Sequence, residues 1–161
     1  MTSDQEKLAT WLLATLATDP EDRAIKRRQM LKDAPQSLKV AIKNTTDLEE
    51  FLGSLEYREY PLIHYDGEWI RIADDGLLEF YKLINPISGA VQNKKKYEKV
   101  IDSSEVSEKI KKDLKDFLKS LRGRLADDIT TEIIGYISRS GKDTLWEILR
   151  ILFEFKDSGG S

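Results

Sequence analysis

One Asp-Gly pair, at residues 66–67, constrains the fold of this chain more than any other feature. It separates two short apolar runs within YPLIHYDGEWIRIADDG, residues 60–76. Asp-Gly favours a tight β-hairpin turn because both turn positions accept positive φ at low cost. We therefore predict a hairpin closed by a two-residue loop, in which His64 faces Trp69 and Ile63 faces Ile70.

Alternation along the two predicted strands gives the hairpin a core side and an outer side. Successive side chains of a strand point to opposite faces, so residues two apart share a face. The core side is predicted to carry Ile63, Ile70 and Ile72, and the outer side His64, Trp69 and Arg71. The outer side is thus a candidate contact surface, with the alternative that Trp69 only covers the edge of a neighbouring helix.

Helical periodicity accounts for most of the remaining chain. The predicted helices cover residues 3–19, 20–34, 36–44, 46–55, 76–84, 104–121, 125–137 and 142–155. The segment 85–102 contains Pro86, Gly89 and the run QNKKKYEK, which favour a linker. The sequence therefore predicts a mainly α (α+β) fold with one β-hairpin: a first domain over 1–84, a basic linker over 85–102, a helical region over 103–156 and a flexible tail over 157–161.

The order of elements in the first domain is similar to that of a known family. In TTDLEEFLGSLEYREYPLIHYDGEWIRIADDGLLEFYKLI, a striped helix leads into an apolar strand, a polar turn, a second strand and another helix. This pattern resembles a winged helix-turn-helix domain over about residues 4–84. The resemblance implies a small DNA-binding transcriptional regulator, with its third helix in the major groove and the hairpin as a wing on the DNA backbone.

The charge of the implied reading helix opposes that function. Residues 44–84 contain ten acidic residues and three basic residues. DNA affinity comes largely from neutralising phosphates, so an acidic reading face repels DNA. The alternative hypothesis is a mostly helical interaction subunit of a larger assembly, which binds a protein partner through the acidic surface of residues 47–59.

Basic residues gather elsewhere along the chain. Residues 85–125 contain eleven basic and six acidic residues, a pattern that also suits ordinary solvated helix faces. If the chain binds DNA or another nucleic acid, these bases and the outer side of the hairpin are the candidate contacts. The predicted nucleic-acid-binding residues are Lys26, Arg27, Arg28, Lys39, Lys43, His64, Trp69, Arg71, Lys94, Lys95 and Lys96.

Several kinds of chemistry lack the residues they need. The chain has no cysteine and one histidine, so thiolate chemistry, a histidine metal site and a Ser-His relay are not expected. No glycine-rich phosphate loop occurs. The adjacent acids Asp74 and Asp75 do not face each other on a helix, and Asp74 is explained as a helix cap. We predict a protein that is not an enzyme and has no metal and no cofactor.

The last predicted helix, TLWEILRILFEF, is apolar nearly all round and must be buried. It can pack within the chain or against a second copy, and the second possibility predicts a homodimer through the C-terminal helices. No segment is long and apolar enough to span a membrane, and the N-terminal apolar run lacks a basic flank. We therefore expect no membrane partner, no signal peptide and a cytoplasmic location.

Overall fold

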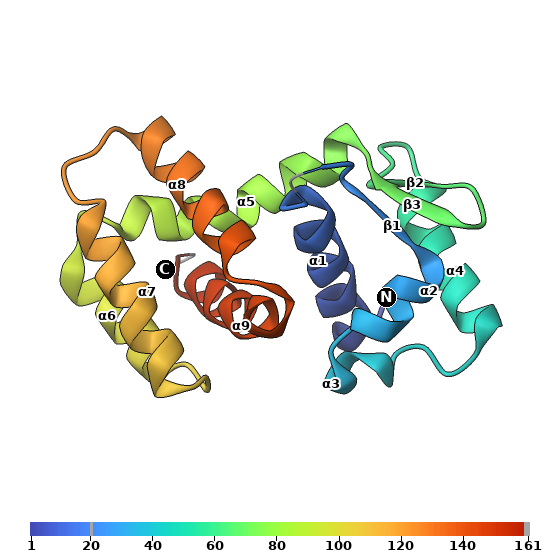
Figure 1. The fold of residues 1–161 in the computed structure, drawn as a ribbon, viewed down its shortest axis with the longest axis horizontal. Coiled ribbons are helices and arrows are strands. Elements are labelled where there is room, and N and C mark those ends of the chain that lie inside the picture. The colour runs from blue at the N-terminus through green and yellow to red at the C-terminus, as the bar shows by residue number, and fades with distance from the viewer. Residues whose placement is uncertain (20, 160–161) are drawn as a thin grey trace. The chain divides into compact units, whose positions relative to one another are not determined.

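The computed structural model describes residues 1–19 and 21–159, which form two compact units (Figure 1). Unit 1 is Met1–Phe80 and unit 2 is Tyr81–Ser161, so the boundary falls within one helix, α5 (Asp74–Ala90). The fold is mainly α with a small antiparallel sheet that includes the hairpin, which confirms the predicted fold class.

Unit 1 combines helices with the sheet. Before α5 its elements are α1 (Ser3–Ala17), β1 (Ala24–Lys26), α2 (Arg27–Asp33), α3 (Gln36–Lys39), α4 (Thr45–Glu56), β2 (Ile63–Tyr65) and β3 (Trp69–Ile72). The strands lie in the order β1-β3-β2, and both pairings are antiparallel. Helix α1 packs against α3 and β3, and α4 packs against β2.

The prediction of a continuous helix over residues 20–34 was wrong. Residues Ala24–Lys26 form β1, and only Arg27–Asp33 form a helix; Pro20 lies outside the described residues. In β1 the buried Ile25 pairs with the buried Ile70 of β3. The local pattern is basic and weakly amphipathic, so pairing with a strand distant in the sequence overrides its helical tendency.

The hairpin forms at Asp66-Gly67, but its register differs from the prediction by two residues. Ile63 pairs with Ile72, His64 with Arg71 and Tyr65 with Ile70, so four residues connect the paired positions. The carboxylate of Asp66 accepts hydrogen bonds from the backbone N–H groups of residues 68 and 69, at 2.9 and 2.8 Å. These bonds stabilise the longer loop. An even shift keeps each side chain on its predicted face.

One glycine allows α5 to lie close to the hairpin. A Cβ atom on Gly76 would lie 2.1 Å from the backbone oxygen of Leu62 and 3.1 Å from a methyl group of Leu13. A side chain at this position is therefore excluded by backbone as well as by the core. Because it has no side chain, Gly76 lets the first turn of α5 pack directly against the segment that precedes β2.

Unit 2 is helical throughout the part of it that the structure describes. After α5 it contains α6 (Lys94–Ser103), α7 (Glu108–Ser120), α8 (Ala126–Arg139) and α9 (Lys142–Gly159). Helix α6 packs against α7 and α9, and α7 packs against α9. The ring of Phe117 on α7 stacks on that of Tyr136 on α8, with 4.3 Å between ring centroids.

The structure contradicts the linker predicted over residues 85–102. Helix α5 continues through Pro86 to Ala90, and α6 occupies most of the remainder. An interior proline costs a helix about 3 kcal/mol. Here Leu83, Ile84 and Ile87, on both sides of the proline, are buried, and this burial outweighs the local cost.

The C-terminal prediction also needs correction. Helix α9 extends to Gly159, so part of the tail predicted over 157–161 is helical, and the remainder lies outside the described residues. The apolar residues of α9 are buried in the chain itself: Leu145, Ile148, Leu149, Ile151, Leu152 and Phe155. The homodimer prediction assumed that the apolar last helix is not covered within the chain. Because its apolar residues are buried, this helix no longer supports a homodimer.

Candidate interaction surfaces

The outer face of the sheet brings four of the predicted contact residues together. His64 and Arg71 pair across β2 and β3, and Lys26 of β1 pairs with Trp69 of β3. The Lys26 ammonium lies 5.2 Å from the centroid of the Trp69 ring, and the Arg71 guanidinium lies 5.7 Å from it. Both distances suit cation–π contacts. Lys26 also forms an ion pair with Glu68 at 3.6 Å, which reduces the net charge of this face.

Arg27 belongs to a different cluster, although it is adjacent to Lys26. Its guanidinium forms an ion pair with Glu49 of α4 and donates a hydrogen bond to the Tyr65 hydroxyl at 3.3 Å. The Tyr65 hydroxyl in turn donates to Glu49 at 2.9 Å. Burial and the Glu49 contact raise the pKa of Tyr65, and the Tyr65 and Glu49 contacts raise that of Arg27. Arg27 thus ties α2 to α4 and β2, and its charge is neutralised within the protein.

The outward face of α4, the reading helix in the winged-helix interpretation, is acidic and shallowly grooved. The groove has a volume of about 570 Å³ and is lined by Thr45, Thr46, Glu49, Glu50, Gly53, Ser54 and Tyr57. The side chain of Tyr57 lies over Gly53 and remains 84% exposed. This face offers carboxylates and an aromatic ring, and its charge has the wrong sign for DNA phosphates.

The remaining candidates of unit 1 lie on other elements than the sheet. Arg28 is exposed on α2, and Lys43 is exposed before α4. Lys39 of α3 donates to the backbone oxygen of Lys32 at 3.3 Å. Within unit 1 the sequence-based set is therefore distributed over the sheet, α2, α3 and the segment before α4.

Lys94, Lys95 and Lys96 form the exposed first turn of α6, not a linker. Helix α6 starts here because Asn93 caps it, accepting a hydrogen bond from the backbone N–H of Lys96 at 3.2 Å. Tyr97, Val100 and Ile101 of this helix are buried at helical spacing. The lysines therefore project outward from a helix that is held by its apolar side.

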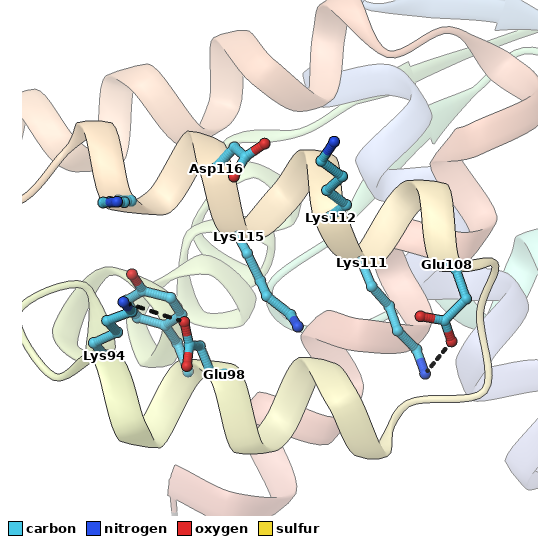
Figure 2. A pocket seen from close by; sticks show the side chains of 9 residues that line it. Lys94, Glu98, Glu108, Lys111, Lys112, Lys115 and Asp116 are labelled. Atoms are coloured by element: carbon cyan, nitrogen blue, oxygen red, sulfur yellow. Dashed lines mark ion pairs between the residues drawn. The ribbon is translucent and has the colours of Figure 1, made fainter.

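A lysine-lined cleft of about 240 Å³ lies between α6 and α7. Figure 2 shows Lys111 and Lys115 pointing from α7 toward α6, whereas Lys112 and Asp116 project from the other side of α7. Lys111 forms an ion pair with Glu108 at 3.4 Å, and Lys94 pairs with Glu98 at 3.8 Å. Both side chains of the Lys94–Glu98 pair are exposed, and such a pair contributes about 0–1 kcal/mol, so an incoming anion can replace Glu98 as the partner of Lys94 at small cost.

Tyr97 also lines this cleft and is fully buried. Its hydroxyl has no hydrogen-bond partner among the described residues, and burial raises its pKa. A buried hydroxyl without a partner costs about 1–3 kcal/mol. Tyr97 is not among the contact residues predicted from the sequence. Its position inside the run KKKYEK, three residues after Lys94, was the available signal.

The two units carry opposite net charges. Unit 1 contains 16 acidic and 10 basic residues, whereas unit 2 contains 13 acidic and 16 basic residues. Counterion release favours contact between a polyanion and the basic unit. The chain's overall charge of −3 hides this separation.

Comparisons with known proteins add no assignment, because no protein-family model, curated protein or solved structure matches this chain. Across residues 1–19 and 21–159, no group of three or more His, Cys, Asp or Glu residues is placed to hold a metal ion. None of the helices within these ranges has the length and apolar character needed to cross a membrane.

Proposed function

We propose that this chain is a non-enzymatic nucleic-acid-binding protein that contacts DNA phosphates through the lysine-rich face of α6 and α7. The observation that carries this proposal is the convergence of lysines from both helices on one cleft, within a unit that has a basic excess. A lysine contacts a phosphate as a point charge, which gives affinity without base specificity. Regulation of transcription would be a consequence of this binding.

In this proposal unit 1 has a different role from the one that the winged-helix resemblance implies. Four helices, α1 to α4, precede the β2–β3 hairpin, the last of them leads directly into it, and α5 follows it; this order supports the resemblance. Its α4 face presents Glu50 beside a Glu49 that is already paired with Arg27, and the described residues that line its groove offer no cation to phosphate, so α4 does not enter the major groove in this proposal. The outer sheet face, with Trp69 between two cations, is at most an auxiliary contact.

Fluorescence anisotropy with random duplex DNA at low and moderate salt tests the proposal. Wild-type protein should bind at low salt, with log K falling linearly with log salt concentration. Replacing Lys94, Lys95 and Lys96 by alanine should weaken binding and reduce the slope by about 0.9 for each phosphate that the variant no longer neutralises. Absence of binding at low salt would exclude the proposal.

A matched triple variant controls for net charge. Lys7→Ala, Lys32→Ala and Lys156→Ala remove the same three charges from α1, α2 and α9. This variant should retain the wild-type salt slope. If the two triple variants lose affinity equally, overall charge and not the α6 surface determines binding.

A second candidate function, docking of a basic protein partner on α4, is supported by the groove around the 84% exposed Tyr57. Exposed tyrosines are common anchors of protein interfaces, and the carboxylates select a basic partner. A labelled basic amphipathic peptide should bind wild-type protein more tightly than the Tyr57→Ala and Glu50→Ala variants. Equal binding to all three proteins would remove this candidate.

A further inference from the structure

The cleft between α6 and α7 has features of a discrete anion site. Lys111, Lys115 and Lys119 recur every four residues on α7, so they form one stripe on this helix. Two of them point toward α6 in Figure 2. Lys94 and Tyr97 face the cleft from α6 at a spacing of three residues.

The unpartnered hydroxyl of Tyr97 is an observation independent of the lysines. Its side chain is fully buried, it lines the cleft, and its oxygen has no partner in the described part of the chain. Because burial raises the pKa of Tyr97, the hydroxyl keeps its proton at neutral pH and can donate. A neutral donor beside ammonium groups suits an oxyanion, which accepts hydrogen bonds at each oxygen.

The charges around the cleft leave a positive excess. Five lysines line it, against Glu98, Glu108 and Asp116. Asp102, which forms an ion pair with Lys115, lowers the excess from two charges to one. A backbone phosphodiester carries one negative charge, which equals this excess, and a free phosphate carries about 1.5–2 at neutral pH, which is larger than it.

We propose that this cleft binds a phosphate-type oxyanion, with Tyr97 donating a hydrogen bond to one oxygen and Lys94 and Lys119 supplying ammonium groups. The volume of about 240 Å³ exceeds the roughly 30 Å³ that one water occupies in the liquid, so a phosphate group has room. The phosphate is either a nucleic-acid backbone group, in which case the inference rests on the proposed function, or a free phosphate compound.

Titration of the full chain with inorganic phosphate, followed by amide NMR shifts at constant ionic strength, tests the free-phosphate source. Wild-type protein should show saturable shifts in α6 and α7. Tyr97→Phe should weaken the phosphate affinity by about tenfold or more, since it removes one hydrogen bond to a charged group. The variant retains the ring and removes only an unpartnered atom, so its circular dichroism and Tm should match those of the wild type or exceed them.

Two controls separate the site from general ion effects. Tyr136→Phe removes a tyrosine hydroxyl from α8, outside the cleft, and should leave phosphate binding unchanged. Lys94→Ala with Lys119→Ala should weaken binding, whereas Lys7→Ala with Lys156→Ala removes two lysines that do not line the cleft and should leave binding unchanged. Equal losses in the two double variants would overturn the site.

Titrating the same variants with random duplex DNA tests whether the bound phosphate belongs to a nucleic-acid backbone. If Tyr97→Phe weakens DNA binding while inorganic phosphate gives no saturable shifts, the cleft seats a backbone phosphate. If phosphate binds and DNA does not, the proposed function fails and the oxyanion site stands. Unchanged binding of both probes by Tyr97→Phe, or binding of neither probe by wild-type protein, would overturn the inference.

Discussion

Unit 1 and unit 2 both pair cations with carboxylates, but they differ in the sign of the charge that is left over. In unit 1 the conspicuous cations have carboxylate partners: Arg27 pairs with Glu49 and Lys26 with Glu68. In unit 2 the cations outnumber the carboxylates, and lysines of two helices surround a buried tyrosine whose hydroxyl has no partner in the described residues. The ion pairs of unit 1 hold its elements together, whereas the lysines and the Tyr97 hydroxyl of unit 2 can bind a ligand.

This difference shows why a list of basic residues is a poor guide to a binding surface. Adjacent residues Lys26, Arg27 and Arg28 look alike in the sequence. In the structure Lys26 lies on the sheet face, Arg27 is neutralised by α4 and Arg28 is exposed on α2. The availability of a charge depends on its partner and not on its residue type.

The largest expected effect contrasts two glycines of α5, one in each unit. Gly76→Ala places Cβ 2.1 Å from a backbone oxygen, so we expect destabilisation by about 3 kcal/mol. Gly89→Ala meets nothing within 4 Å, and we expect stabilisation by about 0.5–1 kcal/mol because alanine favours the helix. Urea denaturation of both variants measures the difference. Equal effects would show that the close approach at Gly76 is wrong.

The next contrast concerns two tyrosine hydroxyls. Tyr65→Phe removes a donor to Glu49 and an acceptor for Arg27, so we expect a loss of about 0.5–1 kcal/mol in this partly exposed cluster. Tyr97→Phe removes a hydroxyl without a partner, and stability should be unchanged or increased. Thermal unfolding without phosphate measures both. A clear loss in Tyr97→Phe would mean that its hydroxyl has a partner in the folded chain.

The hydroxyl groups of Tyr65 and Tyr97 should also make the stability of the chain depend on pH. Burial raises the pKa of both Tyr65 and Tyr97 above the ordinary value of 10.0. A group with a raised pKa in the folded state binds its proton more tightly there, so stability is lost as pH rises above 10.0. The loss should be smaller in each phenylalanine variant than in wild-type protein. Chemical denaturation between pH 9 and pH 11, near the ordinary tyrosine value, measures this loss.

A smaller effect is expected when charges of unit 1 are reversed. Lys26→Glu with Arg28→Glu should change affinity for duplex DNA by less than about threefold at moderate salt, because distant charges are screened there. The anisotropy assay described for the α6 variants measures this change. A loss larger than that of the α6 triple variant would place the DNA surface on unit 1.

The smallest effect concerns the hairpin turn. The backbone N–H groups of Trp69 and Glu68 donate to Asp66 and lower its pKa below the ordinary 3.8. A lowered pKa means that the turn gains stability above pH 3.8, and this gain is lost as pH falls through the folded-state value. NMR titration of the Asp66 carboxyl group measures the pKa. A value at or above 3.8 would contradict the hydrogen bonds that define the four-residue connection.

The sequence predicted local features whose cause is local. The Asp-Gly pair located the hairpin, and period-two alternation placed His64, Trp69 and Arg71 on one face, although the register was wrong by two residues. The apolar stripe of residues 48–55 located α4. These predictions succeeded because turn chemistry and side-chain periodicity act over a few neighbouring residues.

Features that depend on distant partners could not be read from the sequence. Strand β1 forms because β3 lies beside it, and α5 continues through Pro86 because apolar residues on both sides of the proline are buried. The neutralised charge of Arg27 and the buried hydroxyl of Tyr97 depend on side chains far along the chain. The sequence by itself determined most of the helices, the position of the hairpin and the balance of charge. Only tertiary packing decided which charges and polar groups kept partners, because desolvation and pairing depend on three-dimensional neighbours.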